Sequence, residues 1–154
     1  MKFKQAVLNT PILASAYKSG LQALTTTDAG RIHCDQPRLL SGSVNIDSAL
    51  VRTMPNASRW DYAIGVKRNQ ISDEVIWLEV HPASSTGEVD NVLAKLNWLR
   101  NWVAQNAPNL DILPREYVWV STGPVAFSSN SPQHRRLAAS GLRFAGRRYS
   151  ILSS

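Results

Sequence analysis

Two short segments decide the fold of this chain: RWDYAIGV at residues 59–66 and EVIWLEVH at residues 74–81. Both are rich in β-branched and aromatic residues, which is typical of strands, and the polar residues between them indicate a loop joining antiparallel strands. Each strand contains one carboxylate, Asp61 in the first and Glu79 in the second. An acid in an apolar strand is costly unless it is hydrogen-bonded, paired or bound to a cation. The pair therefore indicates a metal site.

Side-chain alternation along each strand indicates which face of the strand each acid occupies. Asp61 shares its strand face with Ala63 and Gly65, which leave room for a ligand. Glu79 and His81 point the same way from the second strand, which is apolar on both faces outside these positions. We therefore expect the second strand to lie in the centre of a sheet.

The bulk properties indicate one domain, residues 1–154, in a chain that carries a net charge of +6. A single cysteine excludes an internal disulfide and a metal site of several cysteines. No segment approaches the roughly 18 consecutive apolar residues of a membrane span, and no secretory signal follows the N-terminal lysines, so we expect no membrane partner and a cytoplasmic location. The sequence leaves the oligomeric state open.

Positive charge is concentrated near the C-terminus, where residues 112–154 contain six arginines and one acid. The planar guanidinium group suits phosphate, so a nucleic-acid partner is expected, with DNA considered first. The candidate phosphate-binding residues are Arg135, Arg136, Arg147 and Arg148. The alternative is a basic face that only aids solubility.

The flanking segments predict the other elements. Helices are expected over residues 10–26, 46–54, 88–106 and 132–140, and strands over residues 117–122, 142–144 and 149–152. Residues 27–45 have turn and loop character. The helix at 88–106 has the strongest apolar periodicity, with a capping box at its start. Lys95 lies beside its apolar stripe and either reaches a cleft or extends to solvent.

The order of these elements, together with Asp61 and the Glu79-Val80-His81 motif, resembles the PD-(D/E)XK (restriction-endonuclease-like) nuclease superfamily over residues 10–122. The resemblance implies an α/β (α+β) fold with a central mixed sheet of about 4–5 strands flanked by helices. It also implies that Asp61 and Glu79 hold Mg²⁺ or Mn²⁺, which activates water against a phosphodiester. The lysine of the family motif is replaced by His81, and Lys95 resembles the migrated lysine of some members.

Two functions follow as expectations. One is a Mg²⁺-dependent endonuclease in which Asp61, Glu79, His81 and Lys95 are catalytic. The other is a catalytically inactive module of the same fold that binds nucleic acid or a protein partner.

Purely structural roles for the same residues stay open as well. Asp61 could pair with Arg59 or Arg52, Glu79 could pair with Lys67 or Arg68, and His81 could be a half-buried histidine. Asp47 is expected to serve its helix N-terminus rather than catalysis.

Overall fold

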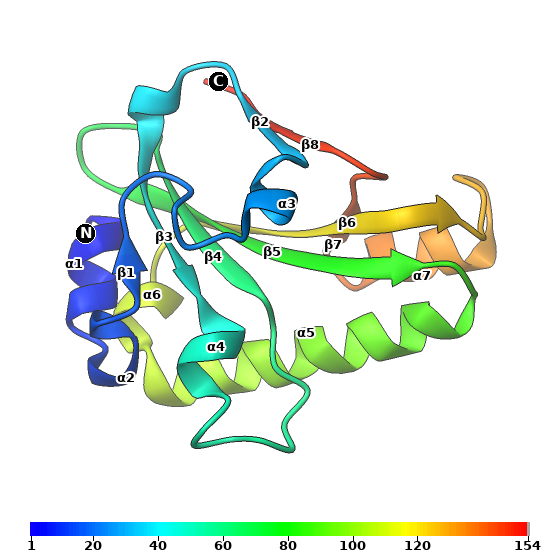
Figure 1. Cartoon of the computed structure of the whole chain (residues 1–154), viewed down its shortest axis with the longest axis horizontal. Helices are drawn as coiled ribbons and strands as arrows, with labels where there is room; N and C mark the ends of the chain where they lie inside the picture. The colour runs from blue at the N-terminus through cyan, green and yellow to red at the C-terminus, as the bar shows by residue number, and fades with distance from the viewer. Residues whose placement is uncertain (154) are drawn as a thin grey trace.

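Strand β5 (Asp73–Ala83) lies inside a six-stranded mixed sheet of the order β1-β3-β4-β5-β6-β7 in the computed structural model, which describes residues 1–153 (Figure 1). The other strands are β1 (Tyr17–Lys18), β3 (Leu40–Asn45), β4 (Tyr62–Lys67), β6 (Arg115–Val125) and β7 (Leu142–Phe144). The pairs β1–β3, β3–β4 and β4–β5 are antiparallel, whereas the pairs β5–β6 and β6–β7 are parallel. The predicted antiparallel pair and its central second strand are confirmed.

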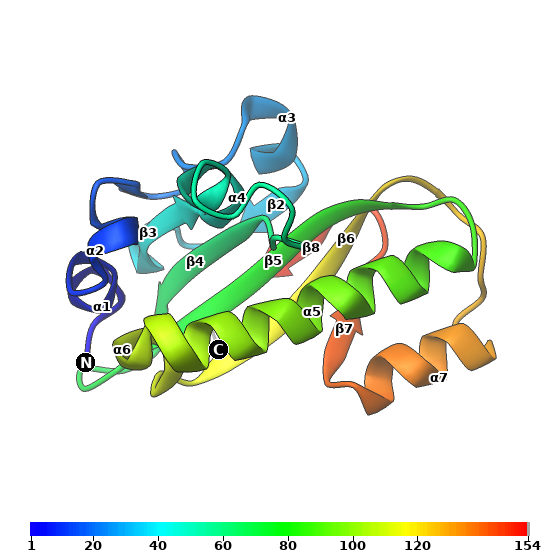
Figure 2. The same ribbon diagram turned by 90° about the horizontal axis from the view of Figure 1, so that it is seen from below.

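Helices flank this sheet. They are α1 (Phe3–Leu8), α2 (Pro11–Ala14), α3 (Thr26–Ala29), α4 (Ile46–Leu50), α5 (Gly87–Asn106), α6 (Pro108–Asp111) and α7 (Pro132–Ala139), with a short 3₁₀ turn at Pro37–Leu39. The long helix α5 runs across one face of the sheet (Figure 2). The opposite face carries α3 and a second, two-stranded parallel sheet of β2 (Ile32–Cys34) and β8 (Tyr149–Ile151).

The core is divided by the sheet into two apolar clusters. Val75 and Trp77 of β5 belong to the cluster that contains the buried residues of α5, such as Leu96. Ile76 and Leu78 belong to the cluster that contains β2 and β8. Both faces of β5 are therefore buried, in agreement with its apolar sequence.

Several predicted boundaries are correct. Helix α4 begins at the predicted cap, since the Asn45 side chain accepts a hydrogen bond from the Ser48 N–H at 2.9 Å. Helix α7 is capped in the same manner, since the Ser131 side chain accepts a hydrogen bond from the His134 N–H. Helix α5 has nearly the predicted length, but the predicted capping box does not form, because its N-cap residue Thr86 makes no side-chain capping bond.

The predicted helix over residues 10–26 is wrong. Only the four residues of α2 are helical there, and the chain then forms β1, whose Tyr17 pairs with Val44. Gly20 has a positive φ of 53°, a conformation that ends a right-handed helix. Helix α1 and strand β3 were not predicted at all. Strand β3 has the sequence LSGSVN, in which glycine and serine conceal the strand character.

The sheet is also larger than the expected 4–5 strands, because the unpredicted strands β1 and β3 join it, while β7 forms the predicted edge strand. Pro82 does not end β5, nor do Gly123 and Pro124 end β6. The β5–β6 register shifts between His81 and Ala83, and such an irregularity accommodates a proline that cannot donate a ladder hydrogen bond. Strand β8 pairs with β2 instead of extending the main sheet.

No helix within residues 1–153 combines the length and the apolar character that a membrane crossing requires.

The contact between α1 and β4 gives a test of this packing. Phe3 is fully buried, its backbone N–H donates to Asp73 Oδ2 at 2.8 Å, and its ring covers Gly65 so closely that a Cβ at position 65 would overlap it. We expect Gly65→Ala to lower the free energy of unfolding by about 2–3 kcal/mol in urea denaturation. The control is Gly123→Ala, where a Cβ would meet no atom within 4 Å.

A double-mutant cycle makes this test specific. In a Phe3→Ala background, Gly65→Ala should cost less, because the overlapping ring atoms are gone and only the Cβ of residue 3 would still lie close, at 2.6 Å. Equal costs in both backgrounds would contradict this account of the contact.

Candidate active site

The candidate site lies where β4 begins beside the middle of β5. Asp61 directly precedes β4, Glu79 lies in β5, and Lys95 reaches them from α5. Because β4 and β5 are antiparallel and Tyr62 pairs with Leu78, the chain brings the two carboxylates together across neighbouring strands. The structure thus groups three of the predicted site residues.

The two carboxylates are fixed by an exchange of hydrogen bonds with the backbone. Asp61 Oδ2 accepts a hydrogen bond from the Val80 N–H at 2.9 Å, and Glu79 Oε1 accepts one from the Asp61 N–H at 3.2 Å. Beyond Tyr62 and Leu78, where the backbone pairing of β4 with β5 ends, these two side-chain hydrogen bonds continue the connection between the two segments. One oxygen of each carboxylate is used in this way, and the other remains for a cation.

Lys95 provides that cation. Its ammonium group hydrogen-bonds Glu79 Oε2 and lies 3.9 Å from Asp61 Oδ1. Glu79 is completely buried, so an unpaired charge there would be strongly unfavourable. Of the two alternatives for Lys95, the structure selects the one in which it reaches the cleft.

His81 lies between two carboxylates. Its Nδ1 is 3.5 Å from Glu79 Oε2, and its Nε2 is 2.8 Å from Glu88 Oε2, although Nε2 makes no hydrogen bond of good geometry. The interaction with Glu79 raises the pKa of His81, and burial opposes this effect. His81 therefore carries a positive charge over a wider pH range than a free histidine.

The pKa of Asp61 is strongly perturbed. Burial, together with the negative charge of Glu79, raises the pKa of Asp61 to about 7 from 3.8, while Lys95 and the Val80 N–H oppose the shift. Asp61 therefore ionises near neutral pH. A further cation beside it would favour the ionised form.

A cleft of about 350 Å³ opens next to Lys95, with Asp47, Arg59 and Asn91 also in its wall. Arg59 Nε lies 2.8 Å from Asp47 Oδ1, so Arg59 does not neutralise Asp61. Arg68 pairs with Glu74 at 3.0 Å and not with Glu79. These two structural alternatives for the acids are therefore not formed.

The residues present offer few ligands for a metal ion. Over residues 1–153, no cluster of three or more histidine, cysteine, aspartate or glutamate side chains is arranged to hold one. Mg²⁺, however, is commonly bound by one or two carboxylates, with water and a substrate phosphate completing its octahedron. Asp61 Oδ1 and Glu79 Oε2, the two oxygens that face Lys95, fit such a site if the ammonium group moves aside.

The four candidate arginines do not form one cluster. Arg135 and Arg136 lie on α7, where Arg135 donates to the Asn130 carbonyl at 2.7 Å and Arg136 pairs with Asp90 at 2.5 Å. Arg147 and Arg148 line a separate cavity beside α3.

Sequence reasoning missed Glu88 and gave Asp47 a capping role only. Glu88 was expected to complete a capping box, but its carboxylate lies against His81. The position of Glu88 in the sequence could have indicated this contact. The first turn of α5 follows closely after β5, so its side chains return beside the end of that strand.

Comparisons with protein-family models, with curated proteins and with solved structures found no match to this chain.

The pKa of Asp61 predicts a pH-dependent effect on stability. Its raised value means that the folded state favours the protonated acid, so Asp61 weakens the fold as the pH rises from about 4 to about 7. Asp61→Asn should therefore gain stability relative to the wild type as the pH rises from about 4, by up to about 4 kcal/mol at pH 7 and above. Urea unfolding in EDTA at several pH values measures this gain.

Asp111→Asn is the matched control, because Asp111 is partly exposed and pairs with Arg115 at 3.0 Å. Its effect should not change over the same pH range. A stability difference for Asp61→Asn that is identical at both ends of the range would contradict the assigned pKa.

Proposed function

We propose that the chain is a metal-dependent nuclease that hydrolyses phosphodiester bonds of nucleic acid, with DNA as the first substrate to test. One observation carries this proposal: two acids, one directly before β4 and one in β5, are fixed through one oxygen each, and their other oxygens face a single lysine. Such a set of groups suits a hard cation and a phosphate.

The order of elements supports the proposal. Three antiparallel strands, β3, β4 and β5, are followed by α5 and then by β6, which is parallel to β5. We propose that this unit is a restriction-endonuclease-like core. Asp61 and Glu79 occupy the positions that the PD-(D/E)XK resemblance assigns to the metal ligands.

The roles of the residues follow from their contacts. Asp61 and Glu79 would hold Mg²⁺ or Mn²⁺, which when bound polarises the scissile phosphate and activates a water molecule. Lys95, displaced from Glu79, would bind a non-bridging phosphate oxygen and stabilise the charge that develops there. His81 lies between Glu79 and Glu88, and in its neutral form, at a pH above its raised pKa, it can hold the proton that the attacking water loses.

A second candidate is a binding module of the same fold that does not cleave. It is favoured by the lysine itself, since the Lys95 ammonium group already occupies the space between both carboxylates without a metal. His81 in place of the motif lysine points in the same direction. In this case the arginines bind nucleic acid, or another surface binds a protein partner, and the acid cluster serves stability.

Cleavage assays separate the two candidates. We expect the purified protein with Mg²⁺ or Mn²⁺ to cleave single-stranded or double-stranded DNA, or RNA. Asp61→Asn and Glu79→Gln should each lower the rate by about 100-fold or more, because each removes a negative metal ligand. Asp111→Asn, the same kind of change at a distant surface position, should retain full activity.

Intact substrates of all these kinds with both metals would overturn the nuclease proposal and favour the binding module. Cleavage that persists at the wild-type rate in both Asp61→Asn and Glu79→Gln would place the activity elsewhere.

Lys95→Met gives a test of the metal site that does not depend on activity. Without metal, this change leaves the buried Glu79 with only His81 as a possible cationic partner, at 3.5 Å, and should cost about 3 kcal/mol in unfolding experiments. Saturating Mg²⁺ should restore most of this loss, because the ion neutralises the same carboxylates. Lys67→Met, at an exposed lysine, should show neither effect.

If Mg²⁺ leaves the stability of Lys95→Met unchanged while the EDTA-treated variant is destabilised as expected, the acids do not form a metal site.

A further inference from the structure

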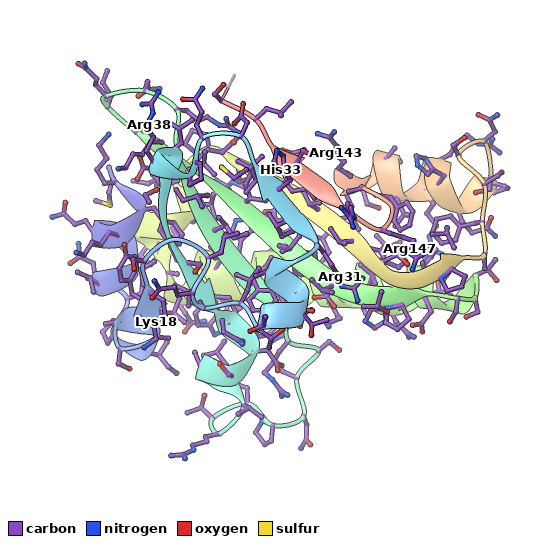
Figure 3. All side chains as sticks on the ribbon, turned by 45° about the horizontal axis from the view of Figure 1, so that its top comes forward. Lys18, Arg31, His33, Arg38, Arg143 and Arg147 are labelled. Atoms are coloured by element: carbon purple, nitrogen blue, oxygen red, sulfur yellow. The ribbon has the colours of Figure 1, made fainter. Side chains whose placement is uncertain are left out.

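A cavity of about 780 Å³ lies between α3 and the turn that joins β7 to β8, and arginines dominate its wall. It is lined by Thr26, Thr27, Gly30, Arg31, Ala145, Arg147 and Arg148. Figure 3 shows Arg31 and Arg147 beside one another on the face of the molecule that carries β2 and β8. The lining includes three positive charges and no acid.

The pairing of β2 with β8 makes two of these arginines, Arg31 and Arg148, neighbours on adjacent segments of the chain. Strands β2 and β8 are parallel, with Ile32 opposite Tyr149. Arg31 and Arg148 directly precede these residues, and the Tyr149 N–H donates to the Arg31 carbonyl at 3.0 Å. Like charges at adjacent positions of neighbouring strands destabilise a sheet, so this arrangement is unfavourable without an anion.

None of the three arginines has a protein partner that would relieve this repulsion. Within residues 1–153, neither an ion pair nor a side-chain hydrogen bond is formed by Arg31, Arg147 or Arg148. The Nε of Arg31 is buried and has no acceptor. The acid of α3, Asp28, instead accepts a hydrogen bond from the Tyr62 hydroxyl at 2.6 Å.

The turn that bears Arg147 and Arg148 is fixed on the main sheet. The Ala145 N–H donates to the Trp119 carbonyl at 2.9 Å, and the Ser121 N–H donates to the Gly146 carbonyl at 2.7 Å. Gly146 has a positive φ of 74°, which allows the chain to turn there from the main sheet toward β8. The guanidinium groups are thus presented by a framework that is already ordered.

We propose that this cavity binds a phosphomonoester, which is the phosphate group of a nucleotide or of an oligonucleotide end. A terminal phosphate carries close to two negative charges and several acceptor oxygens, which match three guanidinium groups and the hydroxyls of Thr26 and Thr27. The volume lies in the range of small-molecule sites. The site is distinct from the Asp61–Glu79–Lys95 cluster, and its occupation does not require cleavage.

Binding of matched oligonucleotides in EDTA tests the proposal on the full chain. The probes are one oligodeoxynucleotide with a 5′-phosphate, the same one with a 3′-phosphate, and the same one without either. We expect at least one phosphorylated form to bind about tenfold more tightly than the unphosphorylated form, since hydrogen bonds between charged groups are strong. Arg31→Gln combined with Arg148→Gln should abolish this difference, whereas Arg38→Gln, an exposed arginine outside the cavity, should retain it.

Competition by free adenosine monophosphate and by inorganic phosphate shows whether the bound phosphate belongs to a small molecule or to an oligonucleotide end. If they compete with the phosphorylated oligonucleotide and bind with similar affinity, the cavity takes a free phosphate compound. If only the oligonucleotide binds tightly, the cavity takes a chain end. Equal binding of phosphorylated and unphosphorylated oligonucleotides, together with no binding of either small anion, would overturn the proposal.

Thermal unfolding gives a second measurement. Inorganic phosphate should raise the melting temperature of the wild type more than that of the Arg31→Gln, Arg148→Gln variant. The variant should also be at least as stable as the wild type without phosphate, because the repulsion between the two arginines is removed. An equal phosphate effect on both proteins would contradict a specific site.

Discussion

The burial of Glu79 in the middle of the central strand is the constraint on which the candidate site depends. This carboxylate has no exposure to solvent, so its charge must be balanced by groups of the protein. The Asp61 N–H and the Lys95 ammonium group provide this balance, one from the segment before β4 and one from α5. The same interactions therefore fix the end of the strand pair, the position of the long helix above it and the geometry of the acids.

The position of the Asp61 carboxylate in this arrangement is electrostatically unfavourable. Asp61 lies close to Glu79, shares the same lysine and is largely buried, so its ionisation is suppressed until neutral pH. A structural ion pair would be more stable with one acid replaced by a neutral group. Acids with strongly perturbed pKa values are typical of functional sites, where a less stable arrangement serves reactivity.

The sequence was most informative where apolar periodicity is strong. Strands β4 and β5 and helix α5 follow from runs of apolar residues with a clear period, and the faces of β5 follow from simple alternation. Strand β3 could not be predicted, because glycine and serine there gain their strand conformation from pairing with β4. Whether Lys95 faces the acids depends on the rotation of α5 against the sheet. Arg31 was not grouped with Arg147 and Arg148, because only the parallel β2–β8 pairing, formed by distant parts of the chain, brings them together.

That pairing also affects the order in which the molecule can fold. Strands β3, β4 and β5 follow one another in the chain and can associate early, whereas β2 must wait for β8, which follows it only after the whole main sheet. Contacts between segments so distant in sequence close a long loop and form slowly. During synthesis on the ribosome, strands β3 to β6 and the acid cluster can therefore be in place while α3 and β2 still lack their partner. The second apolar cluster stays partly uncovered until β8 emerges, and this interval is when the chain is most exposed to aggregation.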